Sequence, residues 1–179
     1  MHSILFTGHM IDKSGREKER FPVYKEKAAT AAIEKAIISV IDKHGKKLIG
    51  TGSGASGGDI IFHEQCLKNN IHSEMYLPLP INEFKKQSVS FAGSDWDKRF
   101  EDLIKKIPVH IVEVEEGKNV WAEGNLKMFE TAMEAGSSMT VIALWDLKKG
   151  DGTGGTEHMV NMAREKGYEV EIIDMTKLS

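Results

Sequence analysis

The sequence has a single cysteine and no apolar run near the ~18 residues that a membrane-spanning helix requires. One cysteine cannot form an internal disulfide, and the place of Cys66 inside an apolar segment predicts a small buried side chain. The first ten residues, MHSILFTGHM, contain only a short apolar stretch and no cationic leader, so we expect no signal peptide. These features favour a protein of the reducing cytoplasm that does not contact a membrane.

Excess positive charge is also absent, because the formal net charge is -3. A protein that grips long nucleic acid needs a basic surface, so we expect no such partner, whereas a local site for one small anion stays open. The chain has 179 residues, enough to bury the core of one domain, and no linker rich in proline, glycine or serine divides it. A single domain over residues 1–179 is therefore expected.

Short apolar segments and segments with apolar residues at helical spacing alternate along the chain. The predicted strands are 4–6, 47–50, 74–77, 109–114, 140–145 and 169–173, and the predicted helices are 24–45, 59–70, 81–89, 97–107, 120–136 and 157–167. This alternation predicts an α/β fold of three layers, with a mostly parallel sheet of about six strands and helices on both faces. Ligands of such sheets bind beyond the carboxyl ends of the strands.

Two of the predicted strand-to-helix junctions are rich in glycine. The first lies in LIGTGSGASGGDIIFHEQCLKNN, residues 48–70, and the second in WDLKKGDGTGGTEHMV, residues 145–160. Glycines let an anion approach the backbone, and the N–H groups and dipole of the following helix attract it. Residues 52–57 match G-x-G-x-x-G, but the acidic residue that would bind the ribose of a dinucleotide is not clearly placed, and no G-K-[ST] follows. The junctions therefore predict a site for a phosphate-bearing small molecule rather than a dinucleotide site.

The long polar loop after the first predicted strand, TGHMIDKSGREKERFP, needs a functional reason or is disordered. His9 in this loop is the histidine expected to contact a ligand. The seven histidines of the chain show no metal spacing. We therefore expect no metal and no cofactor. On the segment after the third strand, Arg99 could face a phosphate and Trp96 could stack on a base, or Trp96 could be buried while Arg99 is solvated.

The motifs TGHMID, TGSGASGGDIIFHE, LPLPINEFKKQSV, DWDKRF and GDGTGGTEHM together resemble the SLOG superfamily over residues 6–173. This is a Rossmann-like group related to the LOG nucleotide phosphoribohydrolases and to DprA, and the pattern is similar to the SLOG-like domains of bacterial nucleotide-signalling proteins. The resemblance implies a pocket for a nucleotide or a nucleotide-derived signal, with residues 54–59 and 152–156 as its two phosphate loops. In LOG enzymes the second loop reads P-G-G-x-G-T-x-x-E, whereas this chain has no proline there and carries Met159 at the position of the catalytic glutamate. Glu157 is displaced from that position by two residues, about 200° around a helix.

The residues expected to bind the ligand come from the first loop, both glycine-rich junctions, and the segments after the third and fourth strands. They are Gly8, His9, Met10, Asp12, Arg20, Gly52, Ser53, Gly54, Ala55, Ser56, Gly57, Gly58, Asp59, Ser88, Trp96, Arg99, Asn125, Gly152, Thr153, Gly154, Gly155, Thr156 and Glu157.

Three functions stay open at this point. The first is a binding module that senses or sequesters a nucleotide-like small molecule. The second is an N-glycosidase, a nucleotide phosphoribohydrolase or a related deoxyribosyltransferase, for which Asp59, Glu64 or Glu157 would supply the carboxyl group near the anomeric carbon. Asp59 and Glu157 also have a structural explanation, because acidic residues stabilise the first turn of a helix. The third is a structural or oligomerising domain without a ligand. A homodimer or higher homo-oligomer is compatible with each of the three.

Overall fold

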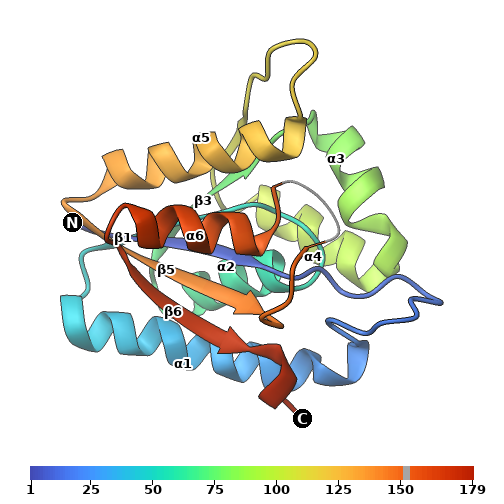
Figure 1. The fold of residues 1–179 in the computed structure, drawn as a ribbon, viewed down its shortest axis with the longest axis horizontal. Helices are drawn as coiled ribbons and strands as arrows, with labels where there is room; N and C mark the ends of the chain where they lie inside the picture. Colours follow the sequence, from blue (N-terminus) through green and yellow to red (C-terminus); the bar gives the residue numbers. More distant parts are fainter. Residues whose placement is uncertain (151–153) are drawn as a thin grey trace.

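Six parallel strands form one sheet in the computed structural model, which describes residues 1–150 and 154–179 (Figure 1). The strands are β1 (His2–Gly8), β2 (Leu48–Gly52), β3 (His72–Leu77), β4 (Val109–Ile111), β5 (Ser138–Trp145) and β6 (Glu169–Asp174). Their order across the sheet is β4-β3-β2-β1-β5-β6, and every neighbouring pair is parallel. The predicted parallel sheet is confirmed; β4 is shorter than predicted and ends at Ile111.

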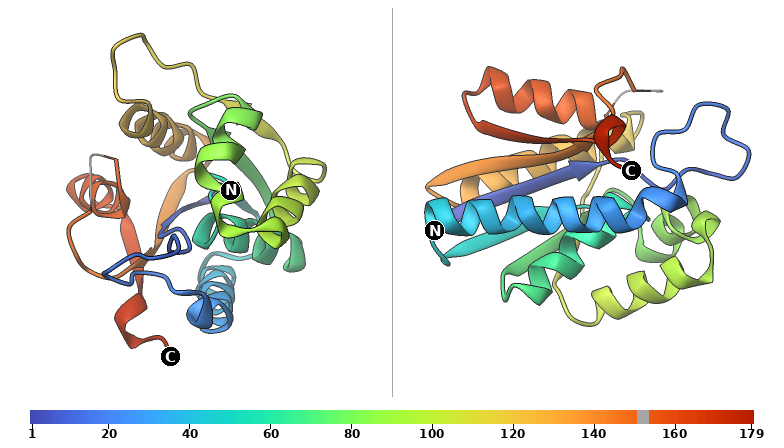
Figure 2. Two further views of the ribbon diagram at one scale, coloured as in Figure 1. Left: turned by 90° about the vertical axis from the view of Figure 1, so that its right-hand side faces the viewer. Right: turned by 90° about the horizontal axis from the view of Figure 1, so that it is seen from below.

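Helices cover both faces of the sheet, as predicted (Figure 2). They are α1 (Glu26–His44), α2 (Gly58–Lys68), α3 (Ile81–Ser88), α4 (Ser94–Ile104), α5 (Val120–Ala135) and α6 (Thr156–Glu165), with short 3-10 turns η1 (Val23–Lys25), η2 (Ser90–Ala92) and η3 (Met175–Lys177). In the right-hand view of Figure 2, α1, α2 and α4 lie below the sheet, and α5 and α6 lie above it. In the described part of the chain, no helix is long and apolar enough to cross a membrane.

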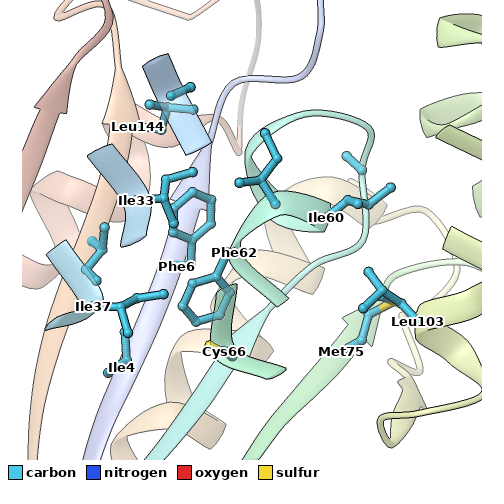
Figure 3. Packing of buried hydrophobic residues seen from close by; sticks show 14 of the residues in the cluster. Ile4, Phe6, Ile33, Ile37, Ile60, Phe62, Cys66, Met75, Leu103 and Leu144 are labelled. Carbon is cyan, nitrogen blue, oxygen red and sulfur yellow. The ribbon is translucent and has the colours of Figure 1, made fainter. Parts of the chain in front are cut away.

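The alternation of side chains along β1 supplies both layers of the core. Ile4 and Phe6 belong to the larger buried cluster, which contains residues of α1, α2 and α4, and Leu5 belongs to the cluster formed by α5 and α6. Phe6 stacks on Phe62 of α2 with ring centroids 4.9 Å apart (Figure 3). Cys66 of the same helix is fully buried, as predicted, and burial raises the pKa of its thiol.

The order in which strands join the sheet reverses at β1, because β2, β3 and β4 lie on one side of it and β5 and β6 on the other. The connection after β1 leads to α1 on one face of the sheet, and the connection after β5 leads to α6 on the other. Loops that leave neighbouring strands toward opposite faces open a crevice beyond the carboxyl ends of those strands. The two loops around β1 and β5 therefore frame the position where a ligand site is expected.

Candidate functional site

A pocket of about 460 Å³ opens at the carboxyl ends of β1, β2 and β5. Thirteen of the residues that line it were predicted from the sequence: Gly8, His9, Met10, Arg20, Ser53, Ala55, Asp59, Ser88, Asn125, Gly154, Gly155, Thr156 and Glu157. The other lining residues are Phe6, Thr7, Lys13, Phe84, Gln87, Trp121, Met128, Trp145 and Gly150. The volume falls within the ~300–1,000 Å³ of typical small-molecule sites.

The first loop is closed by Asp12, whose side chain serves the loop itself. Asp12 Oδ2 accepts hydrogen bonds from the backbone N–H groups of Arg20 and Phe21, at 2.9 and 3.0 Å. The Asp12 N–H group donates to the Phe21 carbonyl oxygen at 2.9 Å. Asp12 does not line the pocket. It brings the two ends of the loop together, which places Arg20 in the pocket wall and Lys13 at the mouth.

The first glycine-rich junction is crossed by the backbone of the first loop. Gly58 N–H, at the start of α2, donates to the His9 carbonyl oxygen at 3.1 Å, and Ile11 N–H donates to the Ser56 carbonyl oxygen at 3.0 Å. Gly57 has φ +109°, and a Cβ atom there would lie 2.7 Å from the Ile11 nitrogen. Glycine is therefore required at position 57 because the backbone of residues 9–11 lies against it, on the side where a phosphate was expected.

The other glycines of this junction make room for the core. A Cβ atom on Gly54 would lie 2.7 Å from Met75 Sδ, and one on Gly58 would lie 3.1 Å from the Phe6 ring. The structure thus places Gly52, Gly54, Ser56, Gly57 and Gly58 behind the pocket wall, while Ser53, Ala55 and Asp59 line it. Gly54, Gly57 and Gly58 are therefore explained by close packing against protein atoms, and a phosphate contact at this junction stays a prediction.

The second glycine-rich junction has the geometry predicted for an anion site. No side chain caps α6, and within residues 1–150 and 154–179 the N–H groups of Thr156 and Glu157 have no acceptor. Gly154 has φ +88° and packs against the backbone of α5, where Asn125 Nδ2 donates to its carbonyl oxygen. Asn125 therefore anchors the end of the junction, two residues before α6, on α5. The predicted residues Gly152 and Thr153 lie outside the described residues.

Asp59 is the most strongly perturbed acid that lines the pocket. It is 7% exposed, and its Oδ2 atom accepts a hydrogen bond from the Ala55 N–H group at 3.2 Å. Burial raises the pKa of Asp59 to about 7, and that single hydrogen bond offsets only part of the effect. At neutral pH a large fraction of Asp59 holds its proton, so this carboxyl group can donate one.

The structure does not bring Glu64, Trp96 and Arg99 to the pocket. Arg99 donates to both carboxyl oxygens of Glu64, at 2.8 and 2.7 Å, and to Glu26 at 2.7 Å. Its guanidinium carbon lies 3.9 Å from the centroid of the Trp96 ring. Arg99, which was predicted to bind phosphate, and Glu64, a candidate catalytic acid, neutralise each other's charge. The contacts of Arg99 with Glu64 and Glu26 tie α4 to α2 and α1.

Four aromatic side chains of the pocket, Phe6, Phe84, Trp121 and Trp145, were not predicted as ligand contacts. The Phe84 and Trp121 rings are tilted by 52° with centroids 6.2 Å apart. Trp145 ends β5, and its Nε1–H donates to the Lys148 carbonyl oxygen at 2.9 Å. Trp145 is the last residue of a predicted strand and precedes a glycine-rich junction, which is a sequence signal for this position. Trp121 stands at the start of a helix that follows a strand, so its place at the sheet edge could be predicted in the same way.

No metal site is formed by the described residues: they contain no group of three or more His, Cys, Asp or Glu side chains that could hold an ion.

Comparisons with known proteins give one structural likeness to report. No protein-family model matches the chain, and no curated protein matches it. The fold is similar to the X-ray structure of DNA processing protein A (DprA) from Streptococcus pneumoniae, with a TM-score of 0.48 and 14% sequence identity. The match covers 99% of this chain and 62% of that one. A likeness at this level carries no argument about function.

Proposed function

We propose that the pocket binds a nucleotide or a nucleotide-derived small molecule, which the protein senses or sequesters. One observation carries the proposal: a single pocket of about 460 Å³ combines aromatic rings, two cationic side chains and the unpartnered N–H groups of a helix start. A nucleotide has a flat base, a sugar with hydroxyl groups and an anionic phosphate, so it complements each of these parts.

The proposal orients the ligand along the pocket. The phosphate lies against the N–H groups of Thr156 and Glu157, where the dipole of α6 favours negative charge. Lys13 adds positive charge from the first loop, whereas Arg20 Nε lies 3.6 Å from Asp146 Oδ2. The base lies toward Trp121, whose half-buried ring offers an apolar surface for stacking, with the buried Phe84 beside it.

A panel of mononucleotides, cyclic nucleotides and ADP-ribose derivatives, followed by mass spectrometry of what the protein retains, tests the proposal. We expect Lys13→Gln to weaken retention and Lys18→Gln to leave it unchanged. Both lysines are exposed and belong to the first loop, but Lys18 does not line the pocket. Equal retention by the two variants would contradict the assigned role of Lys13, and retention of no nucleotide by the wild-type protein would refute the proposal.

Tryptophan fluorescence gives an independent readout. Trp121 and Trp145 line the pocket, whereas Trp96 is buried under Arg99 at another site. A bound nucleotide should change the emission of the wild-type protein and of Trp96→Phe by the same amount. Loss of the change in Trp96→Phe would place the ligand elsewhere.

Asp59 supports a second candidate, cleavage of an N-glycosidic bond by a hydrolase or a related deoxyribosyltransferase. A carboxyl group whose pKa is raised to about 7 can protonate a departing base at neutral pH. Release of free base that is lost in Asp59→Asn would support this candidate. If the wild-type protein retains a nucleotide intact, the candidate is rejected and the binding proposal stands.

A further inference from the structure

His9 and Asp146 stand next to each other at the switch point between β1 and β5. His9 follows β1 and Asp146 follows β5, and His9 Nε2 lies 3.0 Å from Asp146 Oδ1. His9 is the one histidine among the described residues that line the pocket, and its side chain is 10% exposed. A ring nitrogen held by a buried carboxyl group fixes the orientation and the tautomer of an imidazole.

Asp146 is built to stay ionised. Burial alone would raise its pKa, but the Lys148 N–H group donates to it at 3.1 Å, His9 contacts it and Arg20 Nε lies 3.6 Å away, so the pKa is lowered on balance. Its side chain is 4% exposed. A carboxylate at this position needs a donor on the His9 side as well, since burying its charge is costly without hydrogen bonds.

The tautomer of His9 follows from its two neighbours. The backbone N–H group of Asp146 also points at Nε2, at 3.1 Å, so Nε2 either donates to the carboxylate or accepts from this N–H group. A hydrogen bond to a charged acceptor is roughly twice as strong as a neutral one, and a bare nitrogen 3.0 Å from a carboxylate oxygen would oppose two lone pairs. We assign the hydrogen to Nε2, which satisfies the buried carboxylate and leaves the Asp146 N–H group without an acceptor on the ring.

The other ring nitrogen is then an acceptor. Burial lowers the pKa of His9, and Asp146 offsets part of that shift, so the ring is neutral at pH 7. Nδ1 makes no hydrogen bond to the described residues and is not enclosed by protein. The charged groups around the ring are Asp146, Arg20 and Asp12.

We propose that His9 and Asp146 form a recognition dyad, in which Asp146 positions the ring and Nδ1 of His9 accepts a hydrogen bond from a sugar hydroxyl group of the bound nucleotide. The dyad makes the pocket selective for ligands whose sugar carries a free hydroxyl. Asp146 is a positioning residue, and His9 is the residue that touches the ligand. The identity of the ligand rests on the proposed function, whereas the state of the dyad does not.

Diethyl pyrocarbonate tests the dyad in the ligand-free protein, because this reagent modifies accessible unprotonated imidazole nitrogens. Peptide mass spectrometry compares His9 with two internal references, the exposed His158 and the fully buried His63, whose ring nitrogens contact Ser73 and a backbone carbonyl. We expect His9 and His158 to react and His63 to stay unmodified. In Asp146→Asn the rate at His9 should fall on the order of tenfold, with His158 unchanged.

Nitrogen-15 NMR of the imidazole groups keeps the test decisive if Asp146→Asn is unstable. The wild-type spectrum should show His9 with a protonated Nε2 and an unprotonated Nδ1 at pH 7. A His9 that stays unmodified like His63, or that carries its hydrogen on Nδ1, would overturn the dyad.

Selectivity is tested by mass spectrometry of the protein incubated with the four ribonucleoside monophosphates and their 2′,3′-dideoxy forms. Retention of the ribonucleotides alone, with the preference lost in His9→Phe, supports the inference. Equal retention of both series overturns it while leaving the proposed function in place. Retention of neither series refutes the hydroxyl-binding role together with nucleoside monophosphate binding.

Discussion

Replacement of Gly57 by alanine tests the crossing of the first loop over the start of α2. The added Cβ atom would lie 2.7 Å from the Ile11 nitrogen, 2.9 Å from the His9 carbonyl oxygen and 3.0 Å from the Met10 carbonyl carbon. All three are backbone atoms, so no side chain can rotate away. The loop or the helix start must move.

The size of the effect has two parts. Holding an L-residue at φ +109° costs on the order of 1–3 kcal/mol. Moving the loop away also weakens the hydrogen bonds from Gly58 to His9 and from Ile11 to Ser56, each worth about 1 kcal/mol. The sum is about 3–5 kcal/mol of unfolding free energy, which for a chain of this size lowers Tm by at least about 6 °C.

Gly15→Ala is the matched control. Gly15 belongs to the same loop and also has a positive φ, +78°, but no atom lies within 4 Å of its virtual Cβ. The control carries only the conformational cost of about 1–2 kcal/mol. Urea denaturation and thermal melts of both variants measure the difference, and an equal loss of stability in the two would refute the crossing contact as the reason for glycine at position 57.

Three further predictions concern charged groups. Arg99→Met should lower the free energy of unfolding by about 1–3 kcal/mol, since Glu64 loses its partner, and should leave nucleotide retention unchanged; a loss of retention would return Arg99 to the pocket. The pKa of His2 is lowered by burial and then by the stacked His44, whose ring centroid lies 3.7 Å away, so the unfolded chain binds more protons below pH ~6.5. The stability of the wild-type protein relative to His2→Asn should therefore fall as the pH drops below this value, and a difference in urea midpoint that stays constant with pH would contradict the role assigned to His2. Asp59 holds its proton in the folded state up to about pH 7 but loses it near pH 4 when unfolded, so the contribution of Asp59 to stability should decrease as the pH rises between these values. Asp59→Asn should remove this dependence. The free energy of unfolding of the variant relative to the wild-type protein should rise by at most about 4 kcal/mol from pH 4 to pH 8, as measured by urea denaturation.

The sheet and its helices could be predicted from the sequence because each strand and helix carries a local signal. Residues 141–145 are apolar throughout, as a strand covered on both faces requires, and β5 is buried over this range. The glycine-rich segment after β5 likewise lies at the predicted helix start. Both signals depend only on residues that are neighbours in the sequence, so they can be read without knowledge of the fold.

The roles of the first glycine-rich junction and of Arg99 could not be predicted in this way. Glycine at position 57 is needed because the backbone of Ile11 crosses it, and that contact joins segments far apart in the chain. Arg99 likewise meets its partner Glu64 across 35 positions. A motif shows that a close approach occurs, and only the fold shows whether a ligand or the protein itself makes it.

The proposed function puts a nucleotide in the pocket between α6, α5 and the first loop. A crystal structure of the protein with a nucleotide retained from the panel tests it most directly. We expect phosphate oxygens within hydrogen-bond distance of the Thr156 and Glu157 N–H groups, with the base beside Trp121. A nucleotide bound away from this pocket, or one whose phosphate lies against the start of α2, would contradict it.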